Sequence, residues 1–150
     1  MRKIFILFLL FISACGYQPL YKVDKNLTKL EINETKILGN AKIGKKIIDK
    51  LPFTIDKNNE LLNKISIESK NDIIETSKNS KGQVTSYRTV INVNFKILNK
   101  DNEILSEKFL KKEFSYNSDE NKFKFKEYQN TIEENLINKI VEDIIIDLNL

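Results

Sequence analysis

An uninterrupted apolar run, Ile4–Ile12, opens the hydrophobic pattern of this 150-residue chain. The basic pair Arg2–Lys3 precedes the run, and the small pair Ser13–Ala14 follows it. That order is the anatomy of a bacterial export signal. A membrane-spanning helix needs about twenty apolar residues, roughly twice this length, and a core strand would not begin a chain behind two cations. The pattern therefore predicts a signal peptide over residues 1–14.

The signal ends on a cysteine where an ordinary signal has only small residues. The sequence Ile12-Ser13-Ala14-Cys15 fits a lipobox, in which the thiol is acylated and cleavage leaves the lipidated cysteine first in the mature protein. Each buried methylene adds roughly 0.8 kcal/mol to membrane binding, and a single chain holds only marginally. We therefore expect no cofactor beyond a covalent diacylglycerol and an acyl chain on Cys15. Residues 15–26 should form an extended, lipidated lead-out, because Pro19 disfavours a helix at the residue before it.

After this lead-out the pattern alternates and then changes to helical spacing. Leu30 and Ile32 share one side of the stretch 27–34 and polar residues share the other, which predicts a short half-buried strand. An amphipathic helix of about three turns should follow, and Pro52 should end it. Its apolar residues are Ile43, Ile47, Ile48 and Leu51.

Three long alternating segments come next. The first is Leu61–Ile73, after which a polar patch over residues 76–82 turns the chain. The clearest strand then places on one face the residues Tyr87, Ile91, Val93, Phe95 and Ile97. In the third strand, Ile104–Tyr116, the apolar phase shifts between Phe109 and Leu110, which predicts a β-bulge. We expect these consecutive strands to form an antiparallel meander.

A long amphipathic helix closes the chain and reaches about Leu148. Its apolar stripe is wide enough to pack on a sheet and to touch the first helix. The stripe steps by four through Tyr128, Ile132, Leu136, Ile140 and Ile144. Two starting points fit the sequence: Thr131-x-x-Glu134 reads as a capping box, whereas Phe125 and Tyr128 extend the stripe upstream.

The predicted element order is β-α-β-β-β-α, within a single α/β domain over residues 27–150. The fold class is α+β: a two-layer sandwich in which two helices cover one face of a four-stranded, mostly antiparallel sheet. The other face of the sheet keeps polar residues and is open to water or a partner.

Composition narrows the function classes. The chain has 25 basic and 21 acidic residues, and loss of Arg2 and Lys3 with the signal leaves a net charge of about +2. A nucleic-acid-binding protein should show a strong basic excess, so we expect no nucleic acid as a partner. The chain has no histidine, which removes the commonest general base and metal ligand. Its single cysteine is committed to lipid and leaves no intramolecular disulfide. We predict no metal site.

Acidic and hydroxyl residues form no catalytic arrangement. Glu133–Glu134 and Glu142–Asp143 are neighbouring pairs on the last helix, and neighbours on a helix do not face each other. They indicate surface charge. A charged solvated face is indicated on the third long strand by Lys108, Lys111, Lys112 and Glu113. No Ser-x-x-Lys, no Gly-x-Ser-x-Gly and no glycine-rich phosphate loop occurs. We expect a protein that is not an enzyme.

Two basic clusters are candidates for anion binding. The first surrounds the tip of the hairpin between the first two long strands and comprises Lys78, Lys81 and Arg88. The second alternates with phenylalanine in a predicted loop before the last helix and comprises Lys122, Lys124 and Lys126. Cations bind phosphates, and aromatic rings cover apolar chains, so these regions suit a ligand that has both. The alternative is solvated loops whose lysines reflect A/T-rich codons.

Two short motifs resemble a known family. Cys15-Gly16-Tyr17-Gln18-Pro19-Leu20-Tyr21 looks like the Cys-Gly-aromatic-x-Pro-Leu-Tyr start of alphaproteobacterial LPS-assembly lipoproteins, the LptE family. Gly82-Gln83-Val84-Thr85-Ser86-Tyr87 is similar to the Gly-x-Thr-x-Tyr pattern at the start of that family's long hairpin strand. The predicted order of elements resembles the family through the rest of the chain.

The resemblance implies an outer-membrane lipoprotein that faces the periplasm and plugs the lumen of the β-barrel translocon LptD. Such a protein assists folding of the barrel and binds lipopolysaccharide during its transport to the cell surface. The implied partners are an LptD-type barrel, lipopolysaccharide and, through the lipid anchor, the outer membrane. Gly16 agrees with outer-membrane sorting, because the aspartate that retains lipoproteins in the inner membrane is absent. The family's basic residues near the hairpin tip and before the last helix are linked to lipopolysaccharide, which suggests as binding residues here Lys81, Arg88, Lys124 and Lys126.

Two other readings stay open at the level of the sequence. One is a lipid-anchored periplasmic binding or scaffolding module with a different envelope partner. The other is a small hydrolase that uses serine or carboxylate groups. Co-purification of an outer-membrane barrel separates the first from the LptE reading, and turnover of an acyl or glycan substrate would favour the second.

Overall fold

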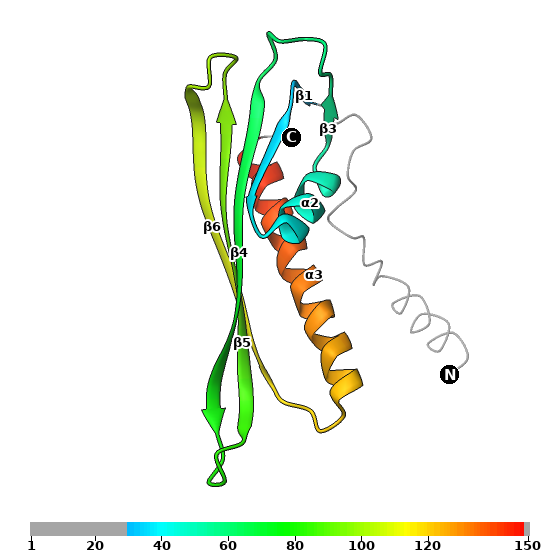
Figure 1. The fold of residues 1–150 in the computed structure, drawn as a ribbon, viewed down its shortest axis with the longest axis vertical. Coiled ribbons are helices and arrows are strands. Elements are labelled where there is room, and N and C mark those ends of the chain that lie inside the picture. The colour runs from blue at the N-terminus through cyan, green and yellow to red at the C-terminus, as the bar shows by residue number, and fades with distance from the viewer. Residues whose placement is uncertain (1–29, 149–150) are drawn as a thin grey trace, which may run out of the picture.

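The structure is a computed structural model that describes residues 30–148. Six strands and two helices follow one another in this range (Figure 1). They are β1 (Leu30–Ile32), β2 (Thr35–Gly39), α2 (Ala41–Lys50), β3 (Phe53–Ile55), β4 (Lys64–Lys78), β5 (Val84–Leu98), β6 (Ile104–Asn117) and α3 (Lys122–Asp147). The predicted signal peptide, the lipidation site Cys15 and the lead-out over residues 15–26 lie outside the described residues.

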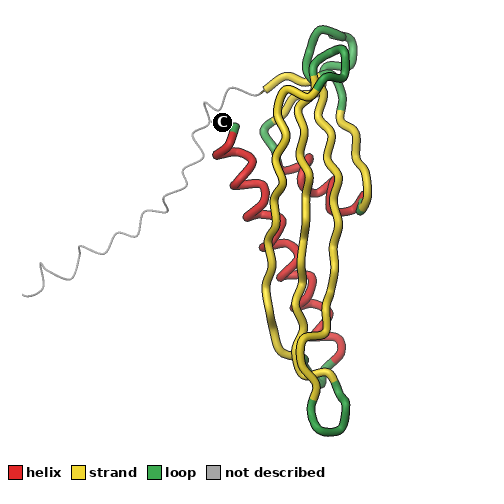
Figure 2. The backbone as a smooth tube through the Cα atoms, turned by 90° about the vertical axis from the view of Figure 1, so that its left-hand side faces the viewer, coloured by secondary structure: helices red, strands yellow, loops and turns green. Residues whose placement is uncertain are grey.

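Four of the strands form one mixed sheet in the order β2-β4-β5-β6. β2 and β4 pair in parallel, with α2 between them in the chain, whereas β4, β5 and β6 pair antiparallel. Both helices lie on the same side of this sheet, and no helix or strand within residues 30–148 covers its other face, which we call the uncovered face (Figure 1 and Figure 2). The predicted α+β architecture of two helices on a four-stranded sheet is confirmed.

The first strand of the large sheet is not where the sequence pattern indicated. Of the predicted strand 27–34, the described part contributes only β1, which pairs in parallel with β3 in a separate two-stranded sheet. The first strand of the large sheet is β2. Its pattern is weak, because Ile37 is half-buried against the helices while Leu38 is exposed and Gly39 has no side chain.

The long strands also differ from their predicted limits. Leu61 is 77% exposed in the loop before β4, and β4 continues through the start of the predicted polar turn to Lys78. The predicted bulge between Phe109 and Leu110 is wrong, since β5 and β6 stay in register there. The apolar phase changes for another reason: Leu110 packs against the core, whereas Phe109 is exposed on the uncovered face.

Each helix begins at an asparagine cap. Asn40 caps α2, which ends before Pro52 as predicted. The side chain of Asn121 accepts two backbone amide hydrogen bonds of 3.1 Å at the start of α3. The helix therefore starts upstream, and the capping box at Thr131 is wrong. The Thr131 hydroxyl instead donates to the Glu127 carbonyl within the helix, at 3.1 Å.

The core lies between the sheet and the two helices. Gly44 allows α2 to approach the sheet closely, because a β-carbon there would lie 2.5 Å from the Ile37 side chain. The apolar stripe of α3 is buried as predicted from Ile132 to Ile144, whereas Tyr128 at its start is 45% exposed. Central residues of the core are Ile65, Ile67, Ile91, Val93, Ile132, Leu136, Ile140 and Ile144.

Candidate functional site

The tip of the β4–β5 hairpin presents Lys81 to solvent. Asn79 organises the turn: its Oδ1 accepts hydrogen bonds from the amides of Lys81 and Gln83 at 2.9 and 3.0 Å. Gly82 takes a φ of 77°, which glycine adopts without steric cost. Lys78 pairs with Glu75 at 3.2 Å. Lys81, in contrast, makes no ion pair with any residue of the range 30–148.

The second basic cluster is helical. Lys122, Lys124 and Lys126 occupy the first turns of α3, so the prediction that they precede the helix is wrong. Residues two apart on a helix point to nearly opposite sides, so the alternation with phenylalanine does not separate a basic face from an aromatic one. All three lysines are exposed, and the described part of the chain offers them no ion pair. Figure 1 shows the start of α3 at the same end of the molecule as the β4–β5 hairpin tip.

Aromatic side chains hold this end of α3 against the sheet. The ring of Phe125 packs with centroid distances of 5.3 Å to Tyr87 and 5.9 Å to Tyr116. Tyr128 meets Tyr116 edge-on at 5.9 Å. The Tyr116 hydroxyl also shares a buried hydrogen bond of 3.0 Å with Thr89. Phe125 is therefore committed to the fold and not available to a ligand.

Arg88 lies on the uncovered face of β5 and is engaged there. Its Nε donates to Ser115 Oγ at 3.2 Å, and its Nη1 lies 3.7 Å from Glu113. A hydrogen bond from Lys111 lowers the pKa of Glu113, and the charge of Arg88 contributes to this shift. Within residues 30–148, therefore, Arg88 has a carboxylate partner, whereas Lys81, Lys124 and Lys126 have none.

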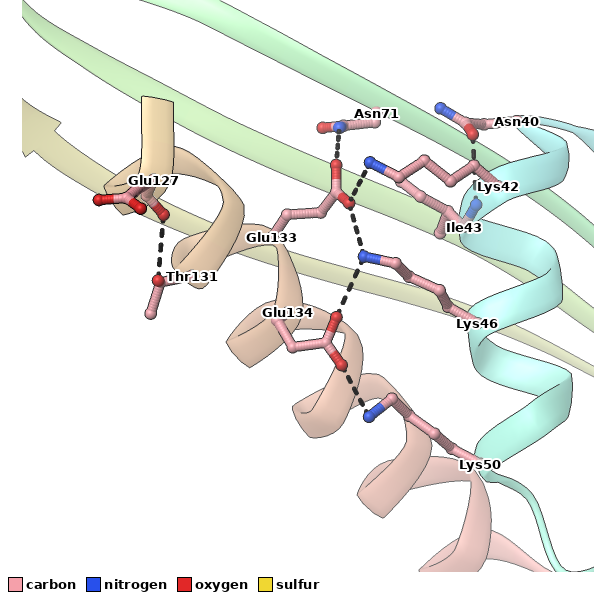
Figure 3. Close-up of polar contacts among 10 residues, drawn as sticks. All are labelled: Asn40, Lys42, Ile43, Lys46, Lys50, Asn71, Glu127, Thr131, Glu133 and Glu134. Carbon is pink, nitrogen blue, oxygen red and sulfur yellow. Dashed lines mark hydrogen bonds and ion pairs between the residues drawn. The ribbon is translucent and has the colours of Figure 1, made fainter. Parts of the chain in front are cut away.

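Sequence reasoning missed an ionic network that joins the two helices (Figure 3). Lys42, Lys46 and Lys50 recur every four residues on α2 and face Glu133 and Glu134 of α3. The Lys46 Nζ lies 3.1 Å from both carboxylates. Lys42 lies 3.1 Å from Glu133, and Lys50 lies 2.7 Å from Glu134. The four-residue spacing of the lysines indicates that they share one face of α2. The sequence does not show what this face contacts, because the two glutamates lie far away in the chain. The interpretation of Glu133–Glu134 as surface charge is therefore wrong for Glu133, which is largely buried, whereas Glu134 lies at the surface but is paired.

The network shifts the pKa values of its members. Burial would raise the pKa of Glu133, whose side chain is 14% exposed, but hydrogen bonds and charge from Lys46 and Lys42 outweigh burial and lower it. Hydrogen bonds from Lys50 and Lys46 lower the pKa of Glu134. Burial opposes the charge on Lys46, yet its two carboxylate partners raise its pKa.

These shifts predict acid-sensitive stability. Carboxylates with a lowered folded pKa stabilise the domain above their usual pKa of 4.5, and this contribution is lost as pH falls through the folded values. Glu133→Gln with Glu134→Gln should lower the free energy of unfolding at pH 7, by about 1 kcal/mol or less per pair. The variant should then lose less stability than the wild type on acidification to pH 3, measured by urea denaturation. Glu142→Gln, at an exposed residue of the same helix, is the control. An unchanged acid dependence in the double variant would contradict the assignment.

Two lysines of β6 also pair with α3. The Lys112 Nζ lies 2.6 Å from Asp143, and Lys108 pairs with Asp147. The prediction that these two residues share one solvated face with Lys111 is therefore wrong, although the Lys108 side chain is 46% exposed. Lys111, on the uncovered side of the strand, pairs at 2.8 Å with Glu113 and agrees with the prediction.

Neither a metal-binding cluster nor a membrane-spanning helix occurs within residues 30–148. No group of three or more histidine, cysteine, aspartate or glutamate residues is placed to hold a metal ion there. No helix in that range is long and apolar enough to cross a bilayer.

The chain matches the family model described as LptE, lipopolysaccharide-assembly, over residues 36–148. Rare lipoprotein B from Shewanella oneidensis has a similar structure, with 13% identity, a TM-score of 0.58 and coverage of 78% of this chain and 94% of that one. Lipoprotein B from Nitrosomonas europaea has 16% identity and a TM-score of 0.53, with coverage of 79% of this chain and 84% of that one. A minor lipoprotein from Acinetobacter baumannii has 14% identity and a TM-score of 0.51, with coverage of 77% of this chain and 94% of that one. A search of curated protein sequences gives no match.

The family match runs from β2 to the end of α3 and so includes the whole four-stranded sheet and both helices. The structural neighbours have low identity and show the shared fold alone. The match covers well over half of the chain. The chain therefore belongs to the LptE family of lipopolysaccharide-assembly lipoproteins.

Proposed function

We propose that a lipidated Cys15 anchors this chain at the periplasmic face of the outer membrane, where it plugs an LptD-type β-barrel. In this role it assists folding of the barrel and binds lipopolysaccharide in transit to the cell surface, without catalysing a reaction. Family membership supports a place in lipopolysaccharide assembly. The observation that carries the binding proposal is a group of exposed lysines, unpaired within residues 30–148, at one end of the molecule: Lys81, Lys124 and Lys126.

The polarity of the sheet supports the plug. The interior of a large outer-membrane barrel is polar, so a protein that fills it needs a polar surface. The uncovered face of the sheet carries charges that pair with one another, such as Lys96 with Glu107 at 2.8 Å and Lys70 with Asp72 at 2.9 Å. Phe109 interrupts this surface, so it is the charged part of the face that is compatible with a wet, polar wall.

Lipopolysaccharide has phosphates next to acyl chains. The end of the molecule that carries Lys81, Lys124 and Lys126, which we call the lysine end, can contact both. Lysine binds phosphate through charge-assisted hydrogen bonds. Phe123, 72% exposed in the first turn of α3, adds an apolar contact surface beside Lys122 and Lys124. The mature chain has a net charge of only about +2, so local grouping and not total charge must provide the attraction.

Reversing Lys81, Lys124 and Lys126 together to glutamate should weaken lipopolysaccharide binding strongly. Each contact is exposed, so a single reversal should cost no more than about 1 kcal/mol. The loss should be greatest at low salt, where charges are least screened, in binding titrations of the mature chain at two ionic strengths. The fold should survive, because acidic side chains near a helix N-terminus interact favourably with the helix dipole.

The control variant must change the net charge by the same amount without removing an interaction that stabilises the fold. A reversal on α2 at Lys42 and Lys46 is unsuitable, because these residues bind α3. Lys45, Lys57 and Lys100 are exposed and make no ion pair among the described residues. They belong to α2, the β3–β4 connection and the β5–β6 turn, and Figure 1 shows these segments away from the β4–β5 hairpin tip. If their joint reversal weakened binding as much, the interaction would depend on net charge alone and the site would be wrong.

A further inference from the structure

A crevice of about 380 Å³ lies between β6 and α3 at the edge of the sheet. Its volume falls in the range of pockets that bind small ligands, roughly 300–1,000 Å³. β6 is the last strand of the sheet, and no strand within residues 30–148 pairs with its outer side. A ligand can therefore enter the crevice from the edge of the sheet.

The inner surface of the crevice is apolar. Ile132 and Leu136 of α3 are buried and form its floor. Phe114 of β6 and Tyr128 of α3 line it beside them, and their side chains are 46% and 45% exposed. These two rings leave apolar surface that the fold itself does not cover. Grouped apolar exposure of this kind marks an interaction surface.

The crevice is elongated and has a polar rim. The rim residues on α3 include Asn135, Lys139 and Glu142. Together with Tyr128 they recur at intervals of three, four or seven residues, so the crevice follows one side of the helix. From Tyr128 to Glu142 the helix rises by about 21 Å. An apolar floor beneath a polar rim suits a long apolar chain whose outer side contacts water.

The crevice continues the side of α3 on which the lysine end begins. Lys124 lies one helical turn before Tyr128, and residues four apart on a helix are neighbours. A ligand whose anionic group binds Lys124 therefore has its apolar part next to the crevice. The acyl chains of one leaflet span about half of the roughly 30 Å hydrocarbon core of a bilayer. One acyl chain consequently fits within the length of the crevice.

The interior offers little to a polar ligand. Such ligands are oriented by a few hydrogen-bonding groups inside their pocket. Within residues 30–148, the buried side-chain atoms that lack a hydrogen-bond partner belong to Asn71 and Asn94, and neither residue lines this crevice. The floor residues Ile132 and Leu136 have no polar side-chain atom. The lining therefore favours an apolar chain.

We propose that the crevice between β6 and α3 holds one acyl chain of lipopolysaccharide, while a phosphate of the same molecule binds the lysine end. This inference rests on the proposed function and adds to it the place of the acyl chain. The chain lies on Ile132 and Leu136, between Phe114 and the rim of α3. Burial of apolar surface provides the attraction in the crevice, and charge provides it at Lys124.

Alkyl maltosides of increasing chain length test the crevice without an anionic group. They are titrated by calorimetry, below the concentration at which they form micelles, into the mature chain with Cys15→Ser. Affinity should rise about two- to fourfold for each methylene from octyl to dodecyl, since a fully buried methylene gives about fourfold. Asn135→Trp, at an exposed rim position, should fill the crevice and weaken dodecyl maltoside binding by about tenfold or more.

Asn130→Trp is the matched control, because Asn130 is exposed on the same helix and does not line the crevice. Circular dichroism should show that both tryptophan variants are folded. The control variant should bind dodecyl maltoside as tightly as the chain without a tryptophan. An affinity that does not depend on chain length, or equal weakening by both tryptophans, would overturn the proposal.

Dodecyl phosphate tests the link between the crevice and the lysine end. It should bind more tightly than dodecyl maltoside at low salt, where charges are least screened. Reversal of Lys81, Lys124 and Lys126 to glutamate should remove this advantage and leave maltoside binding unchanged. Asn135→Trp should weaken the binding of both ligands, and normal binding of the phosphate to this variant would overturn the proposal. If Asn135→Trp weakened both ligands but the reversal had no effect, the crevice would be supported and the lysine end contradicted.

Discussion

Replacing Ile140 with aspartate should unfold the domain. Ile140 is fully buried at the centre of the α3 stripe, where it packs against the sheet. Truncating a buried isoleucine costs about 2–5 kcal/mol, and an unpaired buried carboxylate adds a further penalty. Because a domain of this size is stable by only about 5–15 kcal/mol, we expect the mature variant to lose its cooperative thermal transition in circular dichroism.

Glu142→Lys is the matched control for this prediction. Glu142 is two residues further along α3, exposed, and without an ion pair among the described residues. Its substitution should change the free energy of unfolding by about 0.5 kcal/mol or less. Equal destabilisation by both substitutions would mean that the buried face of α3 is wrongly assigned.

Cys15→Ser should abolish membrane anchoring. The prediction depends on the lipobox Ile12-Ser13-Ala14-Cys15, since a serine hydroxyl cannot form the thioether that carries diacylglycerol. The variant should accumulate as an uncleaved precursor or a soluble form, seen by membrane fractionation and intact-mass measurement. An unmodified Cys15 thiol in the wild-type protein would remove the basis for the proposed location.

The long elements could be predicted because their patterns are strong. The central strand alternates without a break from Ile91 to Ile97, and the α3 stripe repeats from Ile132 to Ile144, so these buried faces were predicted correctly. The prediction for the first strand was wrong because alternation shows that a strand is half-buried but not which sheet it joins. Leu30 and Ile32 do face the core, yet they do so from the small β1–β3 sheet.

The candidate site was predicted in composition but not in geometry. Asn121 has the character of a helix cap, and recognising it would have placed Lys124 and Lys126 on α3. The role of Phe125 could not be read locally, because its contacts with Tyr87 and Tyr116 come from distant strands. The same limit applies to the ionic network between α2 and α3, which tertiary packing alone brings together.

Isolation of the tagged, lipidated chain from the outer membrane of its own cells tests the proposed function most directly. The proposed plug predicts that a large LptD-type β-barrel co-purifies in equimolar amount after detergent extraction and stays bound through a second purification step. Recovery of the chain without a barrel, from membranes in which that barrel is present, would contradict the proposal.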